Sequence, residues 1–374
     1  VSGMDRYYQV VKCFRDEDLR ADRQPEFTQI DVEMSFVNRS MVIETCTGLA
    51  RALWREVIGH EVGEIPVLSW QASMDRYGVD APDLRFGLEH VTLDWRGTEF
   101  GVVGRALEEG GIAKAMVIPG GAGDTSRKVL DRWTEFVRGH GLGGLLWGKV
   151  REDGWSGPLS KVEEHLRAGI PGVSAGDLVL VAAGPESRVH AGLGKLRAHI
   201  GRERGLVRAG EYAFCWVVDF PAFEWDEDGE RWSSMHHPFT APKPEHAELL
   251  GSGREGEILT DAYDLVCNGH EIAGGSIRIH DGDIQERVFT ALGLSPEEAK
   301  EKFGFLVDAL SYGAPPHGGI AFGFDRIVML LCGTENIRDV IAFPKTTSAQ
   351  DLMAGSPNLV DPVQLTELHV RNLK

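Results

Sequence analysis

The glycine content and the apolar pattern of the sequence change near residue 88 and again near residue 208, and these two changes limit how the chain can fold. Residues 88–208 are rich in glycine and alternate short apolar runs with amphipathic ones. The residues on either side instead show alternating strand patterns and hairpin signals. Because a strand-rich unit is interrupted by a block of different texture, we predict an α+β fold whose mainly antiparallel sheet is interrupted by an α/β insert.

Apolar periodicity predicts the elements of the insert and of the segment before it. In the insert, we expect strands at residues 115–119, 143–149 and 177–183, and helices at residues 126–137, 159–168 and 186–200. Before the insert, a helix is predicted over residues 45–58 from the spacing of Thr45, Leu49, Ala52, Leu53, Val57 and Ile58. A length of 374 residues exceeds one ordinary core, so two or three domains are expected.

Charge and cysteine content exclude several classes of protein. The formal net charge is -18, which is the wrong sign for a nonspecific nucleic-acid coat, so any nucleic-acid partner must be held by a local basic patch. The five cysteines are scattered without a CxxC pair, which argues against disulfides or zinc and favours a reducing cytoplasm. The first residues lack a signal-peptide pattern and no apolar run is long enough to span a bilayer, so we expect a cytoplasmic protein without a membrane partner.

The first 36 residues predict a hairpin with one apolar and one polar face. Strands are expected at residues 7–17 and 27–36, joined by a polar loop, and alternate residues of a strand share a face. The apolar face carries Thr28, Ile30, Val32, Met34 and Phe36, and the polar face carries Cys13, Arg15, Glu17, Phe27, Gln29, Asp31 and Glu33. A solvated outer face is the ordinary interpretation of such a polar row. The paired opposite charges and the aromatic ring instead favour a pocket for a charged small molecule, in which an arginine fork binds phosphate or carboxylate.

A second cluster lies in residues 264–278. Asn268-Gly269 between two β-prone runs predicts a two-residue hairpin turn, which places Val266 opposite Glu271 and puts Asp264 on the same side. Two close carboxylates form the oxygen-rich arrangement that Mg²⁺ prefers when substrate phosphates complete its shell. In a regular strand Arg278 would point away from Glu271, and we expect a bulge at residues 274–275 to reverse that direction. An exposed hairpin with ordinary surface charges remains the alternative.

A third cluster lies in residues 318–331, which predict a buried strand passing into a buried helix. Asp325 is expected to cap the start of that helix. Arg326 lies in its first turn, and because a buried unpaired charge is costly, it needs an anionic partner from the protein or a ligand. The alternative is an arginine that reaches solvent past the helix end.

Two lesser features are less informative. His236 and His237 are adjacent in a loop, with no further ligand at zinc spacing, so a ligand-contact or surface role is expected. The glycine-rich stretches 119–128 and 192–195 lack the GxxxxGK[ST] pattern, so a P-loop is rejected.

Taken together, these segments resemble the bacterial-type aspartyl-tRNA synthetases, which are class II aminoacyl-tRNA synthetases. Residues 14–31 resemble motif 2 of that family and residues 318–326 resemble motif 3. Residues 235–239, 268–271, 76–78 and 83–86 match further family segments, so the resemblance runs nearly from end to end. It implies an antiparallel six-stranded sheet in a catalytic domain made of residues 1–87 and 209–374, the latter including a C-terminal extension. Residues 88–208 would be the insertion (GAD) domain.

The resemblance also implies roles in binding ATP. The expected ATP-binding residues are Arg15, Asp16, Glu17, Gln24, Phe27, Glu271, Gly323, Phe324, Asp325 and Arg326. Arg15 would contact the α-phosphate, and Arg326 would lie over the adenine and near the γ-phosphate, so these two are the expected catalytic residues. Phe27 would lie under the adenine, and Asp264 and Glu271 would hold Mg²⁺.

The remaining implied roles concern aspartate and tRNA. The expected aspartate-binding residues are Arg15, Gln29, Asp31, His236 and Arg278, with Arg278 on the side-chain carboxylate. Arg20 and Arg23 would contact the acceptor end of tRNA. The reaction implied is ATP-dependent activation of aspartate followed by transfer to the 3′ end of tRNA.

The sequence departs from the family pattern at its start. The anticodon-binding OB-fold, motif 1 and the loop upstream of motif 2 have no counterpart here, so we expect an N-terminally truncated member of a family whose full-length proteins are homodimers. The alternatives are an inactive tRNA- or nucleotide-binding fragment and a paralogue that activates a related amino acid.

Overall fold

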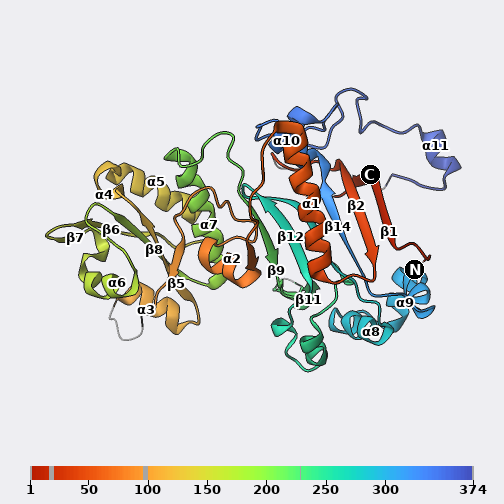
Figure 1. Cartoon of the computed structure of the whole chain (residues 1–374), viewed down its shortest axis with the longest axis horizontal. Helices are drawn as coiled ribbons and strands as arrows, with labels where there is room; N and C mark the ends of the chain where they lie inside the picture. The colour runs from red at the N-terminus through yellow and green to blue at the C-terminus, as the bar shows by residue number, and fades with distance from the viewer. Residues whose placement is uncertain (1, 17–20, 96–99, 228, 373–374) are drawn as a thin grey trace.

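The computed structural model describes residues 2–16, 21–95, 100–227 and 229–372, and these residues form two large sheets and one two-stranded sheet, with their helices (Figure 1). Within the described residues, the larger sheet has seven strands: β1 (Arg6–Phe14), β2 (Glu26–Ser35), β3 (Val67–Ser69), β9 (Phe214–Val218), β12 (Ala262–Cys267), β13 (His270–Ile277) and β14 (His317–Gly323). Their order is β1-β2-β14-β13-β12-β9-β3. The strands of this sheet thus come from both sides of residues 88–208.

The pairing of the larger sheet is antiparallel except at one edge. The six strands from β1 to β9 pair antiparallel, and the three-residue β3 pairs parallel with β9. The expected six-stranded sheet is therefore corrected to seven strands. A strand as short as β3 carries too few residues for a period-two pattern to reveal it.

Helix α1 (Arg39–Ile58) covers one face of this sheet (Figure 1). Asn38 accepts a hydrogen bond from the Met41 backbone N–H and so caps its start, and Gly59 ends it in the left-handed conformation. Its buried residues are Val42, Cys46, Ala50 and Trp54, which pack with Met34 of β2. The predicted helix is confirmed in position, and Leu49 and Leu53 of the predicted pattern pack against the core, whereas Val57 is 61% exposed. Phe36, expected on the apolar face of the hairpin, is also 66% exposed.

The smaller sheet lies within residues 88–208. In the described part of that range its strands are β4 (His90–Thr92), β5 (Ile112–Ile118), β6 (Leu146–Arg151), β7 (Gly154–Ser156) and β8 (Leu178–Gly184), in the order β4-β5-β8-β6-β7. Its helices are α3 (Gly101–Glu108), α4 (Gly121–Asp124), α5 (Arg127–Arg138), α6 (Glu163–Gly169) and α7 (Glu186–Glu203), with a 3₁₀ turn η1 (Pro158–Val162). Strands and helices alternate as predicted, but all pairs are antiparallel.

Helix α2 (Trp70–Tyr77) joins the two sheets by packing against α7 and β4. Arg197 of α7 is buried there, and its guanidinium donates hydrogen bonds to the backbone oxygens of Asp83, Phe86 and Gly87. Lys114 of β5, also buried, donates to the backbone and the carboxylate of Asp75 in α2. Arg197 and Lys114 lie in elements of the smaller sheet's unit and bind residues 75–87, which connect that unit to the larger sheet, so they fix this connection.

The remaining elements surround the larger sheet. They are the hairpin β10 (Phe223–Asp226) and β11 (Arg231–Ser234), helices α8 (Gly282–Ala291), α9 (Pro296–Ser311), α10 (Phe324–Leu331) and α11 (Pro362–Glu367), and the 3₁₀ turns η2 (Pro244–Leu249), η3 (Glu255–Glu257) and η4 (Ile337–Val340). Helix α11 lies at the end of a long extended segment (Figure 1). Within the described residues, no helix combines the length and apolar character that crossing a bilayer requires.

Candidate active site

A cavity of about 640 Å³ opens on the face of the larger sheet opposite α1 and is large enough for a small-molecule ligand. Its walls come from the β1–β2 hairpin, β12, β13, β14, the start of α10 and residues 235–240. The expected site residues that line it are Arg15, Arg23, Gln24, Phe27, Gln29, His236, Asp264, Glu271, Arg278, Gly323, Asp325 and Arg326. Asp16, Asp31 and Phe324 are not part of its lining. Glu17 and Arg20 lie outside the described residues.

The β1–β2 hairpin brings part of its predicted polar face to the cavity, namely Arg15, Phe27 and Gln29. Cys13 pairs with Phe27, and the Cys13 Sγ lies 3.2 Å from Oε1 of Gln29, to which it donates. The guanidinium carbon of Arg15 lies 5.2 Å from the centre of the Phe27 ring, which is a cation–π distance. Asp31 pairs with the cavity residue Ala321 of β14 and therefore borders the cavity.

The acidic pair depends on the predicted turn and on a bulge. Asn268 and Gly269 both have positive φ, at 54° and 82°, as a tight two-residue hairpin turn requires. Val266 pairs with Glu271 as predicted. The register then skips Ile272, so the bulge lies there and not at residues 274–275 as expected. The extra residue reverses the alternation, and Arg278 lines the same cavity as Glu271.

The carboxylates of Asp264 and Glu271 converge over Gly274. A Cβ on Gly274 would lie 2.8 Å from an oxygen of each. Burial and the charge of Glu271 raise the pKa of Asp264 well above its usual value, and its Oδ1 is buried with no hydrogen-bond partner in the described part of the chain. An unpartnered oxygen beside a second carboxylate fits a divalent cation. The described residues contain no cluster of three or more metal-binding side chains, so phosphate oxygens would have to complete the shell.

Arg278 is held by three side chains that the list of expected site residues omitted. Its Nε and Nη2 donate to the two oxygens of Glu33, and its Nη1 donates to Nε2 of His237 at 2.8 Å and to Oγ of Ser276 at 3.0 Å. Burial and the charge of Arg278 lower the pKa of His237 to about 4, so its ring is neutral at pH 7. Glu33 follows Asp31 on the same strand face, a signal that pointed to it.

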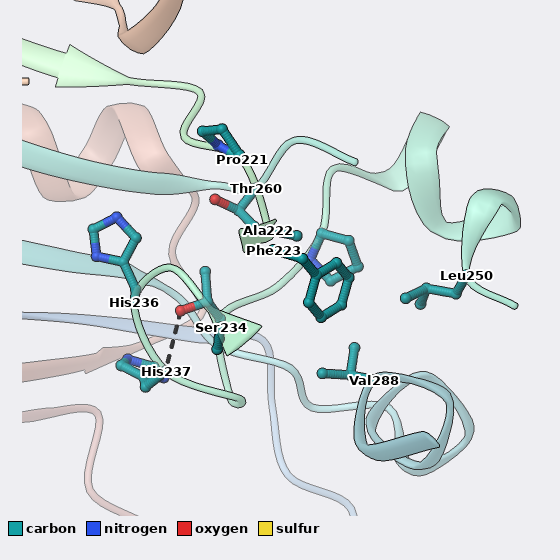
Figure 2. A pocket seen from close by; sticks show the side chains of 11 residues that line it. Pro221, Ala222, Phe223, Ser234, His236, His237, Leu250, Thr260 and Val288 are labelled. Carbon is teal, nitrogen blue, oxygen red and sulfur yellow. Dashed lines mark hydrogen bonds between the residues drawn. The ribbon is translucent and has the colours of Figure 1, made fainter. Parts of the chain in front are cut away.

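His236 lies beside His237 but faces a different neighbour. Its ring meets Phe220 edge-on at 4.6 Å, and its Nε2 is buried with no partner among the described residues. Behind the two histidines is a smaller pocket, where they face Leu250 and Val288 across it (Figure 2). Asp80 also lines the main cavity and raises the pKa of Asp264, a position that no sequence pattern indicated.

Arg326 has the anionic partner that its place in an apolar helix predicted. Its Nη2 donates to the backbone oxygen of Asp22 and lies 3.6 Å from the Asp22 carboxylate, and its Nη1 donates to the backbone oxygen of Glu271. The hydrogen bond from His270 and the charge of Arg326 hold the pKa of Asp22 at about 2 despite partial burial. The predicted cap is wrong: Asp325 lies inside the helix and accepts from the Thr28 backbone N–H at 2.6 Å.

Gln24 lines the cavity, but its amide is engaged elsewhere. Its Oε1 accepts from the Lys345 backbone N–H at 2.8 Å, and its Nε2 donates to the Lys345 backbone oxygen at 3.3 Å. The side chain is buried, at 2% exposure, within an otherwise polar loop. The loop is thus joined to a segment more than 300 residues away in the sequence.

Comparison with known proteins identifies the family to which the sequence is similar. Residues 1–347 match the family of tRNA synthetases class II (D, K and N). An aspartate–tRNA ligase of Macrococcus caseolyticus is 50% identical over 99% of this chain and 64% of its own length. An aspartate–tRNA(Asp/Asn) ligase of Nitratidesulfovibrio vulgaris is also 50% identical, over 99% of this chain and 61% of its own length.

The solved structure of an Entamoeba histolytica asparaginyl-tRNA synthetase, in complex with asparaginyl-adenylate, has a TM-score of 0.46 and 15% identity. The match covers 94% of this chain and 55% of the chain of that synthetase. The chain spans 61–64% of the length of the two ligases above. Since the family model matches more than nine-tenths of the sequence, the chain belongs to the class II tRNA synthetases of the D, K and N group.

Proposed function

We propose that this chain is the catalytic part of an aspartate–tRNA ligase. The observation that carries the proposal is a single cavity lined by Arg15, Arg278, Arg326, Asp264 and Glu271, which come from four separate segments of the chain. Three cationic and two acidic side chains around one cavity can bind a nucleoside triphosphate, with its metal ion, and a small dicarboxylic acid. In this proposal residues 1–87 and 209–374 form the catalytic domain, and residues 88–208 form the insertion domain.

The first chemical step is an in-line displacement at phosphorus. An oxygen of the aspartate α-carboxylate attacks the α-phosphorus of ATP, the bond to the bridging oxygen breaks, and pyrophosphate leaves. Arg15 would bind the α-phosphate and Arg326 the γ-phosphate, where their charges offset the negative charge of the transition state. Phe27 would support the adenine ring. No side chain needs to form a covalent bond, because positioning and charge stabilisation supply the rate.

Asp264 and Glu271 are the residues that would hold Mg²⁺. The unpartnered Oδ1 of Asp264 and the Glu271 carboxylate beside it fit this role, and Gly274 leaves the space between them open. When bound together with ATP, the ion would neutralise charge on the phosphate oxygens.

Selection of aspartate would rest on Arg278. Four of its five N–H groups are used by Glu33, His237 and Ser276, which fix the guanidinium before substrate arrives. A substrate carboxylate adds a charge that matches the arginine, whereas the neutral amide of asparagine does not. Gln29, Asp31 and His236 would complete the aspartate site, with Asp31 near the ammonium group.

The second step would transfer the aspartyl group to tRNA. The terminal ribose hydroxyl attacks the carbonyl of the mixed anhydride, loses its proton, and AMP leaves. Arg23 lines the cavity and would contact the acceptor end, together with Arg20. With a net charge of -18, the chain would depend on such local cations to bind tRNA. A homodimer is the assembly proposed for the full-length protein.

ATP–pyrophosphate exchange tests the proposal. We expect exchange with aspartate and none with asparagine, glutamate or lysine, measured for this chain and for a version extended at its N-terminus. Exchange with another amino acid would identify a paralogue. tRNA binding without exchange by either version would identify an inactive binding fragment, and both results would contradict the proposal.

A further inference from the structure

The described end of the loop between β1 and β2, residues 21–25, lines the cavity and is joined to a distant segment of the chain. We call residues 337–351 the C-terminal strap; they follow α10 and run along the outer side of this loop. The Ile337 backbone N–H donates to the Ala21 oxygen at 2.9 Å, and the Ile337 side chain is buried against the cavity. The second contact is the pair between Gln24 and Lys345.

The Gln24 amide imitates a peptide group in this pair. It accepts from the N–H and donates to the C=O of the same residue, Lys345, while its second N–H is directed to the Arg23 oxygen at 3.4 Å. Both N–H groups of the amide are therefore used inside the protein. An amide fixed in this way is not free to donate a hydrogen bond to a nucleotide, although it lines the cavity.

The Lys345 side chain holds the same loop from the other side of Pro25. Its Nζ lies 3.3 Å from the carboxylate of Glu26, the first residue of β2, and 2.9 Å from the carboxylate of Asp351 within the strap. Lys345 thus contacts residues 24 and 26 at once. The next residue on this strand is Phe27, whose ring faces the cavity beside Arg15.

We propose that Gln24 and Lys345 are positioning residues: the strap holds residues 21–26 so that the ring of Phe27 is set for the nucleotide. The inference rests on the proposed function and assigns Gln24 an indirect role, in place of the direct contact with ATP that the family resemblance implies. It predicts that changes on the strap, outside the cavity, weaken ATP binding selectively.

The test breaks the pair from either side. Lys345→Pro removes the N–H that Gln24 accepts, and Lys345→Ala is its matched control because it removes the ammonium group but keeps the N–H. Gln24→Ala breaks the same pair from the loop, and Gln350→Ala changes an exposed glutamine of the strap. Affinity is measured by calorimetry with Mg²⁺ and an ATP analogue that cannot be cleaved between the α- and β-phosphates, and KM values come from pyrophosphate exchange.

We expect Lys345→Pro and Gln24→Ala each to raise the Kd and the KM for nucleotide about tenfold, with the KM for aspartate changed by less than about twofold. The double variant should be no weaker than either single variant, because both break one contact. Gln350→Ala should stay within about twofold of the parent, and Lys345→Ala should have a smaller effect than Lys345→Pro, because it removes the contact with Glu26 but keeps the backbone pair with Gln24. If Lys345→Pro lowers the melting temperature strongly, a chain ending at Pro344 replaces it, since it removes the Lys345 backbone N–H without introducing a proline.

Two results overturn the inference. One is a raised nucleotide Kd in Gln24→Ala with an unchanged Kd in Lys345→Pro or in the shortened chain, which means that Gln24 contacts ATP directly. The other is an unchanged Kd in both single variants. If the unsubstituted chain itself fails to bind the analogue, the proposed function fails, and this inference fails with it.

Discussion

Arg278 and Glu33 face each other as a two-point ion pair, with Nε to Oε1 at 3.1 Å and Nη2 to Oε2 at 3.2 Å. Glu33 belongs to β2 and Arg278 directly follows β13, and β14 lies between these two strands in the sheet. Gly319 of β14 makes this contact possible, because a Cβ there would lie within 2 Å of the Glu33 carboxylate. The guanidinium is thereby fixed in the cavity without a substrate.

The first prediction concerns Arg278→Ala. We expect kcat/KM for aspartate in pyrophosphate exchange to fall about a hundredfold or more, because the substrate carboxylate loses its partner and Glu33 is left unpaired beside it. The Kd for ATP should change by less than about threefold, since Arg278 is assigned no contact with the nucleotide. Arg254→Ala, at an exposed arginine paired with Glu257, serves as control. Equal loss of aspartate and ATP binding would count against the assignment.

The second prediction concerns Gly274→Ala. The added Cβ would lie 2.8 Å from an oxygen of Asp264 and of Glu271, so one carboxylate must move. We expect Mg²⁺-dependent ATP affinity to fall about tenfold or more while the chain stays folded, as titration calorimetry with and without Mg²⁺ would measure. Gly282→Ala is the matched control, because no atom lies within 4 Å of its Cβ. Unchanged metal dependence in Gly274→Ala would exclude these two carboxylates as the ligands.

The third prediction concerns Asp264→Asn in the absence of ligand. Burial and Glu271 raise the folded-state pKa of Asp264, so its ionisation favours the unfolded chain once the pH exceeds about 3.8. Stability contributed by this site therefore falls as pH rises from that value toward the raised pKa. At pH 7 we expect the variant to have a higher melting temperature than the parent and a free energy of unfolding about 1–3 kcal/mol larger. We also expect it to bind Mg²⁺ and ATP more weakly. A variant that unfolds earlier than the parent would contradict this.

The comparison of sequence and structure separates local from distant causes. The Asn268-Gly269 turn and the pairing of Val266 with Glu271 were predictable, because a two-residue hairpin is determined by its own residues. The bulge was predicted at the glycines but lies at Ile272, since its position depends on how β13 fits between β12 and β14. The expected reversal of direction nevertheless brings Arg278 to the cavity.

Distant contacts account for what sequence reasoning missed. Arg326 in an apolar helix indicated an anionic partner, but nothing local identified Asp22, which lies 304 residues away. Asp325 is a residue type that often caps helices, yet its carboxylate accepts a hydrogen bond from the Thr28 backbone N–H of β2. The apolar spacing in residues 45–58 predicted the helix, but contact with the sheet decides which of its residues are buried, so that Trp54 is buried and Val57 is exposed. The roles of the site residues in binding ATP, aspartate and tRNA stay predictions.

The last prediction concerns acid stability at the junction of the two sheets. His90 of β4 is 5% exposed, and burial together with the charges of Arg197 and Lys114 lowers its pKa to about 3 from an ordinary 6.5. Below pH 6.5 the unfolded chain takes up a proton at this residue and the folded chain does not, so stability is present above that pH and is lost as pH falls toward 3. One such group contributes a slope of up to about 1.4 kcal/mol per pH unit.

We therefore expect the free energy of unfolding to fall by about 2 kcal/mol less in His90→Leu than in the parent between pH 7 and pH 5. Urea unfolding followed by tryptophan fluorescence measures this difference. Leucine fills a similar volume and carries no proton, so stability at pH 7 should be kept or raised. His280→Leu, at an exposed histidine, should leave the pH dependence of the parent unchanged. If His90→Leu loses as much stability on acidification as the parent does, the His90 imidazole is not the group that limits acid stability. His190 at the same junction then becomes the next candidate, because burial lowers its pKa as well.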